Sequence, residues 1–382
     1  MNKHIESNII KSLSREILNE LKGKECLLKE INKDITGDSD VDINNDYSTS
    51  LNFLDHLQTN YDIPPNLKPK GRILMILSYN EPMILSVIPV ISALIAGNKV
   101  YLRPSSKNIN FVRMIWSDKL IKKFNSNLEI LAIDKSELPK IIKSMDCVCF
   151  FGSHNVAREI YKLCAENFIE FLPEIETADC KVVKLLKTTQ EVINQDCENT
   201  LHDAFSHYGQ TCQRISGLFL HTGIYKMYVE TLLNTFLNKQ YSYNSLFTTN
   251  VEIDIQKSCA ENVYQNNNSG YRIVIKPRED SDFYKNGYFA TTLWIQEFKT
   301  EDCLIDSLNH RKYYLGLNII ADDDEFINKI VKNTKYTRYT VNTRHTSVMH
   351  DNGWGGRWPS GSGGYKDWVE HFSNRYQIIH SQ

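Results

Sequence analysis

Apolar runs that alternate with helical patterns between residues 72 and 172 constrain the fold of this 382-residue chain more than any other feature. The run Arg72–Leu77 (RILMIL) is continuously apolar after its first residue, which is typical of a parallel strand that is buried on both faces. A turn at 78–82 and an apolar helix at 83–96 follow it. Further strands are expected at 99–102, 128–133, 147–151 and 168–172, and helices at 109–124, 138–145 and 154–166. This order predicts a doubly wound α/β sheet.

A second alternating series follows Lys184 and predicts a second α/β lobe. Its expected helices lie at 190–206, 225–237, 302–309 and 323–333, and its expected strands at 217–221, 271–275, 292–296, 317–320 and 340–342. The join between the lobes is expected near Val182–Leu186. Residues 1–60 indicate helices that are interrupted by a polar loop at 37–50.

Charge and cysteine usage narrow the class of protein. With 44 basic and 46 acidic residues the net charge is −2, so we expect neither a nucleic acid nor a membrane as partner. The longest apolar stretch, Met83–Ala96, is too short to span a bilayer, and the N-terminal segment lacks the apolar core of a signal peptide. Nine scattered cysteines without a CxxC pair favour reduced thiols over disulfides or a metal site. These features predict a cytoplasmic protein.

Cys212 is the first candidate for chemistry. It follows a Gly209-Gln210 turn and precedes an apolar strand, which would let its thiol project into a cleft. Cysteine is a strong nucleophile near neutral pH because even a small thiolate fraction attacks carbonyl carbons. Taken alone, however, a cysteine is more often an inert residue of the core. The surrounding motifs decide between these readings.

Five motifs occur in a fixed order along the chain. They are the turn Ser78–Pro82 with Ala93–Asn98 and Arg103–Ser106, then Phe150–Ala157, Glu174–Cys180, Gly209–Cys212 and Gly353–Gly363. In this order and at this spacing they resemble the motifs of the aldehyde dehydrogenase superfamily, over residues 70–380. The segments 291–309 and 313–320 are similar to that family's central catalytic strands.

The resemblance implies an α/β fold with a Rossmann-type cofactor domain and an α/β catalytic domain. On this basis residues 1–185 would form the N-terminal helices and the nucleotide-binding domain, with part of 346–373 packing back onto it. Residues 186–345 would form the catalytic domain that carries Cys212. Residues 374–382 would form an oligomerisation strand, because family members are commonly homodimers or homotetramers.

The resemblance also assigns chemistry to three residues. Cys212 would attack the carbonyl carbon of an aldehyde, and Asn80 would bind the resulting oxyanion together with the backbone N–H of Cys212. After hydride transfer to the nicotinamide, Glu174 would activate the water that hydrolyses the thioester. Both glycines of the family's element around Glu174 are replaced here, by Glu176 and Thr177. Glu176 could therefore serve instead, or both carboxylates could simply be solvated.

The cofactor, NADP or NAD, would bind at the turns of the first lobe. The residues that the resemblance assigns to it are Ser78, Tyr79, Arg103, Ser105, Ser106, Gly152, Ser153, Val156 and Ile175. Gly152 and Ser153 stand between a strand and a helix, where backbone N–H groups suit a pyrophosphate; the alternative is a plain turn with Ser153 as the helix cap. Ser106 takes the place of a glutamate that would bind the ribose hydroxyls, so Arg103 without a nearby carboxylate favours NADP.

Departures from the family keep other functions open. The family's E-I-F-G-P loop is missing, so the glutamate that anchors the nicotinamide ribose has no counterpart near Gly287 or Tyr288. The chain is also shorter than is usual for the family. The missing nicotinamide anchor and the altered element around Glu174 are features also seen in relatives that reduce acyl-CoA or other activated acyl groups to aldehydes. The substrate is thus a small-molecule aldehyde or acyl compound, and a catalytically inactive scaffold is the remaining alternative.

Overall fold

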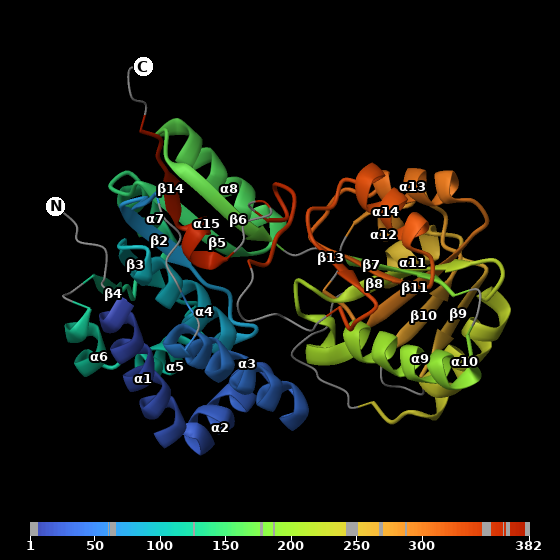
Figure 1. Cartoon of the computed structure of the whole chain (residues 1–382), viewed down its shortest axis with the longest axis horizontal. Coiled ribbons are helices and arrows are strands. Elements are labelled where there is room, and N and C mark those ends of the chain that lie inside the picture. The colour runs from blue at the N-terminus through green and yellow to red at the C-terminus, as the bar shows by residue number, and fades with distance from the viewer. Residues whose placement is uncertain are drawn as a thin grey trace. The chain divides into compact units, whose positions relative to one another are not determined.

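The computed structural model divides the chain into two compact units. The first unit comprises Met1–Ile175, Val348–Trp354 and Tyr365–Gln382, and the second comprises Glu176–Ser347 and Gly355–Gly364. The structure describes residues 7–59, 61, 66–124, 127–175, 179–185, 188–241, 251–266, 270–286, 289–345, 353–361, 363 and 367–378. Each unit has its own sheet, with helices around it (Figure 1).

The sheet of the first unit has five parallel strands in the order β4-β3-β2-β5-β6. The strands are β2 (Arg72–Ile76), β3 (Lys99–Arg103), β4 (Leu128–Ile130), β5 (Cys147–Gly152) and β6 (Glu170–Ile175). Ile73, Leu74 and Met75 of the central strand are all fully buried, because helices cover both faces of the sheet. The predicted α/β fold class is confirmed.

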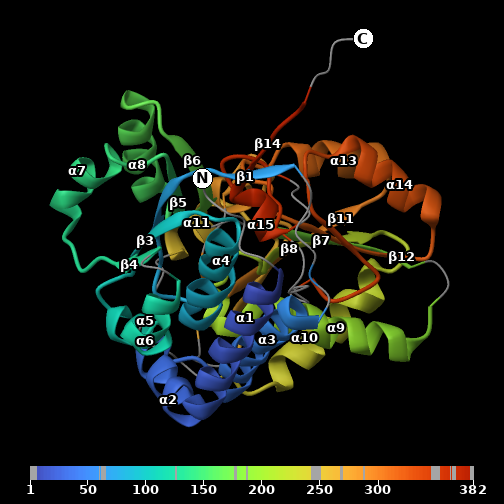
Figure 2. The ribbon, with the colours of Figure 1, turned by 60° about the vertical axis from the view of Figure 1, so that its left-hand side comes forward.

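Helices of the first unit pack on both faces of this sheet. They are α4 (Pro82–Ile95), α5 (Ile109–Ile115), α6 (Asp118–Lys123), α7 (Leu138–Ile142) and α8 (His154–Glu166), preceded by α1 (Ser7–Gly23), α2 (Glu25–Thr36) and α3 (Asp40–Thr59). Every residue of α4 is buried, and α3 packs against it (Figure 2). The helix expected at 109–124 is divided into α5 and α6 at Trp116-Ser117.

The loop expected at 37–50 was wrong, because most of it belongs to α3. The break between helices is limited to a few residues, where Gly37 ends α2 in the left-handed conformation. Ser39 then starts the next helix, since the backbone N–H of Asp42 donates to its hydroxyl at 3.1 Å. The buried face of α3 includes the polar residues Asp42, Asp46 and Ser50. The sequence therefore has few apolar residues at helical spacing in this segment.

The sheet of the second unit has seven strands in the order β13-β12-β7-β8-β11-β10-β9. Its strands are β7 (Asp179–Lys184), β8 (Ile215–His221), β9 (Asn262–Gln265), β10 (Arg272–Ile275), β11 (Thr292–Phe298), β12 (Leu317–Ala321) and β13 (Tyr339–Val341). All pairs are parallel except that of β9 with β10. The expected join at 182–186 overlaps β7, which pairs with β8 and β12 of this sheet.

Helices also cover both faces of the second sheet. Figure 1 shows α11 (Glu252–Lys257), α12 (Asp282–Lys285), α13 (Glu301–Asn309) and α14 (Asp324–Asn333) on one face, and α9 (Gln190–Phe205) and α10 (Tyr225–Asn238) on the other. The short helix η2 (Ser206–Gly209) connects α9 to the loop before β8.

The C-terminal part of the chain contributes to both units. Arg357 forms a bridge with Tyr314 in the second unit. In the first unit, α15 (Trp368–His371) is followed by β14 (Ser373–Arg375), which pairs antiparallel with β1 (Leu67–Pro69) of the same chain. The expected oligomerisation strand at 374–382 therefore begins inside an intrachain pair, and its last four residues lie outside the described ones.

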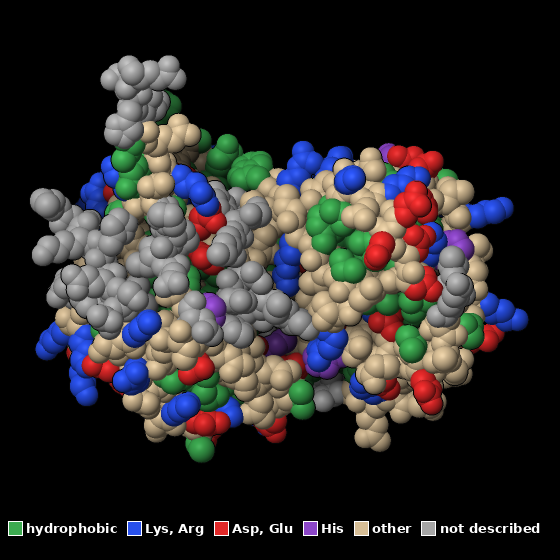
Figure 3. All heavy atoms as spheres, in the orientation of Figure 1, with side chains coloured by type: hydrophobic (Ala, Val, Ile, Leu, Met, Phe, Trp, Pro, Cys, Tyr) green, Lys and Arg blue, Asp and Glu red, His purple; other side chains and the backbone are tan. Residues whose placement is uncertain are grey.

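The surface carries mixed charge. On the face shown in Figure 3, basic and acidic side chains are interspersed over both units. Among the described residues, no helix has the length and apolar character needed to cross a membrane.

Candidate active site

The carboxyl edge of the first sheet has the topology of a nucleotide site. From β2 the chain continues to β3 and β4 on one side, and then crosses to β5 and β6 on the other. The switch point therefore lies between β2 and β5, and ligands of open α/β sheets bind outside the carboxyl ends of the strands at such a point. Ser78, Tyr79 and Asn80 follow β2, while Gly152 and Ser153 end β5 and begin α8. The structure thus places the predicted cofactor residues on one edge.

The turns after β2 and β3 are tied to each other. Asn108 Nδ2 donates to the carbonyl oxygen of Ser78 at 3.0 Å. The backbone N–H of Leu77 donates to the carbonyl oxygen of Arg103, also at 3.0 Å. Lys107 Nζ lies 4.0 Å from the centroid of the Tyr79 ring, a cation–π distance. Ser105 and Ser106 occupy the same turn as Lys107, so all these residues share one rim.

Arg103 carries an unmet donor at this rim. Its Nε is buried without a hydrogen-bond partner, although the side chain as a whole is partly exposed. Burial lowers the pKa of its guanidinium, because the charged form loses hydration. A buried donor without an acceptor is costly, so this part of the edge fits an anionic or hydroxyl-rich cofactor.

The turn after β5 leaves Ser153 available. Ser153 stands at the N-cap position of α8, but its side chain accepts no capping hydrogen bond. A Cβ added to Gly152 would lie 2.8 Å from Cζ of Phe150, so a side chain there would displace that ring. The helix N-terminus behind Ser153 favours an anion, which fits the pyrophosphate of a dinucleotide. Val156 is half-buried in the first turn of α8.

Glu174 lies at the carboxyl end of β6 and is 6% exposed. It pairs in register with Phe151 of β5, and Ile175 pairs with Gly152. The interpretation of Glu174 as a simple solvated carboxylate is therefore wrong, because its side chain is buried. Ile175 is also buried, which leaves its backbone as the part that could meet a cofactor. The alternative base Glu176 lies outside the described residues.

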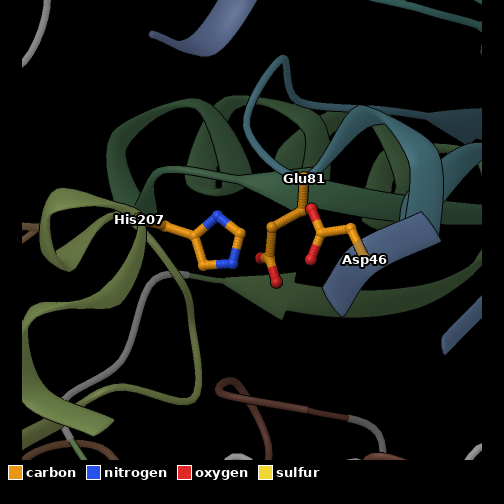
Figure 4. A group of neighbouring side chains, drawn as sticks. All are labelled: Asp46, Glu81 and His207. Carbon is orange, nitrogen blue, oxygen red and sulfur yellow. The ribbon is translucent and has the colours of Figure 1, made fainter. Parts of the chain in front are cut away.

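Asn80 is half-buried in the turn that leads into α4. The next residue, Glu81, is left-handed with φ 50° and precedes Pro82 at the start of the helix. Figure 4 shows the Glu81 side chain beside that of Asp46 from α3, and their carboxylate oxygens lie within 4.8 Å of each other. Sequence reasoning missed this pair, because Asp46 falls in the segment that was expected to be a loop.

In the second unit, Cys212 follows a strained left-handed turn. His207, Tyr208 and Gly209 have φ values of 49°, 52° and 68° in succession. A Cβ added to Gly209 would lie 2.2 Å from the carbonyl oxygen of Ala290, so only glycine fits there. Non-glycine residues in this region store strain, which clusters at functional sites. The Gly-Gln motif is therefore explained by packing against the segment before β11.

Two side chains clamp the loop to that same segment. Gln210 Nε2 donates to the carbonyl oxygen of Phe289 at 3.0 Å. Arg214 is 1% exposed, and its Nη1 and Nη2 donate to the carbonyl oxygen of Thr292 at 2.9 and 2.7 Å. Burial lowers the pKa of Arg214 to about 9, with a smaller contribution from Arg311. Sequence reasoning gave Arg214 no role, since a buried arginine bound by carbonyls has no linear signal.

The exposure of Cys212 separates it from the other cysteines. Five cysteines are buried and three are exposed, whereas Cys212 is intermediate. Burial raises the pKa of the Cys147, Cys149, Cys180 and Cys197 thiols, which keeps them protonated and inert. Beside Cys212, the buried atoms Thr211 Oγ1 and Gln213 Oε1 have no hydrogen-bond partner. A half-buried thiol with unmet polar atoms around it suits a reactive centre.

Comparison with known proteins identifies one family and several relatives. The model of the aldehyde dehydrogenase family matches residues 49–380. A 4,4'-diaponeurosporen-aldehyde dehydrogenase of Staphylococcus aureus is 29% identical over 189 residues, 46% of this chain and 38% of the relative. A D-glyceraldehyde dehydrogenase (NADP(+)) of Picrophilus torridus is 22% identical over 310 residues, 72% of this chain and 61% of the relative. The chain thus spans less than two thirds of either relative.

Solved structures share the fold. A betaine aldehyde dehydrogenase of Staphylococcus aureus in complex with NAD+ superposes with a TM-score of 0.77 at 16% identity, covering 97% of this chain and 82% of that one.

Proposed function

The chain belongs to the aldehyde dehydrogenase family, and we propose on this basis that it oxidises an aldehyde to a carboxylic acid with NAD or NADP through a covalent bond to Cys212. The observation that carries the proposal is the loop at 207–214. Its strained left-handed turn and its two side-chain clamps fix one half-buried thiol among nine cysteines.

Cys212 performs the first step. The thiolate adds to the carbonyl carbon, and the carbonyl π electrons move to oxygen, which gives a tetrahedral thiohemiacetal. Asn80 supplies its side-chain N–H and Cys212 its backbone N–H to the new oxyanion. The clamp by Arg214 and Gln210 supports this step, because attack requires the sulfur to be held in a narrow range of positions.

NAD or NADP, held by the turns at the carboxyl edge of the first sheet, would supply the hydride acceptor, so that Cys212 would be left as a thioester. Glu174 takes a proton from a water molecule, which attacks the thioester carbon and releases the carboxylic acid and the thiol. Its position at the carboxyl end of β6, on the edge of the sheet where the cofactor would bind, supports this role.

The first unit binds the cofactor in this proposal. Its five-stranded sheet offers a topological switch point, the free Ser153 hydroxyl and the unmet donor of Arg103 on one edge. The second unit supplies the nucleophile. We further propose a cytoplasmic homodimer or homotetramer, which sedimentation analysis of the purified chain would test.

The experiment that tests the function is nicotinamide absorbance in both directions. One arm supplies NAD+ or NADP+ with a panel of aldehydes that includes D-glyceraldehyde and 4,4'-diaponeurosporen-aldehyde, after the names of two relatives. The other arm supplies NADH or NADPH with acyl-CoA. We expect cofactor reduction in the first arm and its loss in Cys212→Ser. Activity only in the second arm would instead make the chain an acyl reductase, and silence in both would contradict the proposal.

A further inference from the structure

Two buried carboxylates of the second unit have no part in the proposed mechanism. Asp179 begins β7 and is 0% exposed, and Asp203 lies in the last turn of α9 and is 1% exposed. A carboxylate that is shielded from water is costly unless hydrogen bonds or a cation compensate it. Both carboxylates bind the same residue, His345, whose side chain is also completely buried.

Asp203 lies just before the loop that carries Cys212. Its Oδ2 accepts from the backbone N–H of His345 at 2.9 Å. Shortly after Asp203, α9 ends and leads through η2 to Cys212. Arg214, which follows the thiol, returns to the same helix end, since its Nη1 donates to the carbonyl oxygen of Ala204 at 3.5 Å. The last turn of α9 therefore contacts the loop at its beginning and again after Cys212.

Asp179 lies beside the other end of the same loop. It pairs in register with Ile215, the first residue of β8, and its carbonyl oxygen accepts from Ser216 Oγ at 3.2 Å. Its Oδ2 lies 2.7 Å from His345 Nε2. In the sheet, β8 lies between β7 and β11 (Figure 1). Arg214 ties the loop to the first residue of β11, so Asp179 is the corresponding tie on the β7 side.

Hydrogen bonds around the His345 ring fix its orientation and assign its tautomer. Asn318 Nδ2 donates to Thr340 Oγ1 at 2.9 Å, which leaves the hydroxyl hydrogen of Thr340 for His345 Nδ1 at 3.1 Å. The ring proton then lies on Nε2, which donates to Asp179. The other oxygen of Asp179 accepts from the backbone N–H of Gly316 at 2.9 Å. The ring is bound at both nitrogens, so it cannot turn without breaking a buried hydrogen bond.

We propose that His345 is a positioning residue for Cys212, because it binds Asp203 at the start of the Cys212 loop and Asp179 at its end. The inference rests on the proposed function, since it takes the Cys212 thiol as the nucleophile. A nucleophile must be held in a narrow range of positions, and a loop that is tied only on the β11 side could shift. Separating Asp179 from His345 would take a strong hydrogen bond from a buried carboxylate, which makes this second tie rigid.

Three substitutions test the role of this histidine. His345→Phe keeps a ring but donates nothing to Asp179, so we expect kcat to fall about tenfold to a hundredfold while the KM for the aldehyde changes little. His345→Gln can reproduce the donor at Nε2, so its kcat should stay within about threefold of wild type. Asp179→Asn has one oxygen for two donors and should lose about three- to tenfold in kcat. The matched control is His371→Phe, which replaces a buried histidine of the first unit and should leave kcat unchanged.

A second measurement does not depend on catalysis. Alkylation by iodoacetamide is followed by mass spectrometry without cofactor, and the exposed Cys303 of α13 serves as the internal reference. The ratio of the Cys212 rate to the Cys303 rate should change at least about threefold in His345→Phe and in Asp179→Asn, because the sulfur is displaced. The ratio should remain that of wild type in His345→Gln and in His371→Phe. Circular dichroism and urea unfolding give the folded fraction by which each rate is scaled.

The outcomes separate the inference from the proposed function. An unchanged kcat or an unchanged alkylation ratio in folded His345→Phe would overturn the inference alone. Equal losses in His345→Phe and His345→Gln, or losses that match the folded fraction, would also overturn it, because the histidine would then act only on stability. If His345→Phe does not fold, Asp179→Asn decides by the same criteria. A wild type that oxidises no aldehyde would overturn the proposed function, and the inference with it.

Discussion

At the carboxyl edge of the first sheet, the residues assigned to the cofactor come from four separate turns, whereas Cys212 is presented by one continuous loop. The edge residues are mostly half-exposed and are joined by few hydrogen bonds. The loop has three successive left-handed residues and a fully buried arginine. The difference follows from the task of each region. Binding energy can be shared among many weak contacts, but a nucleophile must hold a single atom in position.

Gly209→Ala should produce the largest effect. The new Cβ would meet the carbonyl oxygen of Ala290 at 2.2 Å, and the residue would keep a left-handed φ of 68°. We expect a loss of about 2–5 kcal/mol in the free energy of unfolding, from the left-handed penalty and overpacking combined. Displacement of the loop should also lower kcat roughly a hundredfold or more. Urea unfolding and steady-state kinetics measure the two effects.

Gly270→Ala is the matched control for this change. Gly270 also has a left-handed φ, of 81°, but an added Cβ would find nothing within 4 Å. Gly270→Ala should therefore lower the free energy of unfolding only by the left-handed penalty, about 1–2 kcal/mol, and should leave kcat unchanged. Equal losses in the two variants would mean that the close approach to Ala290 has no part in presenting Cys212.

Arg214→Met should have the next largest effect. It removes the donors that hold the carbonyl oxygen of Thr292, and unsatisfied buried carbonyls cost about 1–3 kcal/mol. We expect the rate of Cys212 alkylation by iodoacetamide to fall or rise severalfold as the loop shifts, together with a roughly tenfold loss in kcat. Arg158→Met, on an exposed position of α8, should leave both unchanged. Unchanged alkylation in Arg214→Met would limit this arginine to a role in stability.

Sequence patterns predicted the strands whose residues are apolar throughout. They missed a strand whose buried side chains include charged ones. β7 was missed because Lys181 and Lys184 interrupt it, yet Lys181 is buried in a bond to Asp196 at 2.5 Å. The turn before Cys212 was located by its Gly-Gln motif. Its strain was not foreseen, because Tyr208 is a bulky residue, for which a left-handed backbone is an outlier.

We expect acid to lower the stability of the first unit, because this unit contains the buried residue His371. Burial, with a smaller effect of Lys70, lowers the pKa of this histidine from 6.5 to about 3. The folded state keeps the ring neutral while the unfolded chain takes up a proton, so stability falls as pH drops from 6.5 toward 3. Between pH 7 and pH 5 the loss is about 2 kcal/mol, at 1.36 kcal/mol for each pH unit below the unfolded pKa.

His371→Phe removes this titration and keeps an aromatic ring beside Trp368. Denaturant unfolding at pH 7 and pH 5 should then show a smaller difference than in wild type. The control is His310→Phe, an exposed histidine of the second unit for which the pH dependence should remain. An identical pH dependence in wild type and His371→Phe would show that other groups govern acid sensitivity.

Ser153→Ala should give the smallest effect, and it tests whether the cofactor edge is as distributed as it looks. The Ser153 hydroxyl makes no cap for α8, so its loss should change the free energy of unfolding by less than about 0.5 kcal/mol. If the hydroxyl donates to the cofactor, its removal should raise the KM for NAD(P) about three- to tenfold, equivalent to one neutral hydrogen bond of roughly 1 kcal/mol.

Thr300→Ala is the converse control, because the Thr300 hydroxyl does cap α13, by accepting from the backbone N–H of Cys303 at 3.3 Å. That variant should lose about 1 kcal/mol of stability and leave KM unchanged. A hundredfold loss in Ser153→Ala would mean that the edge, like the Cys212 loop, concentrates its function in one group, and the contrast between the two regions would fail.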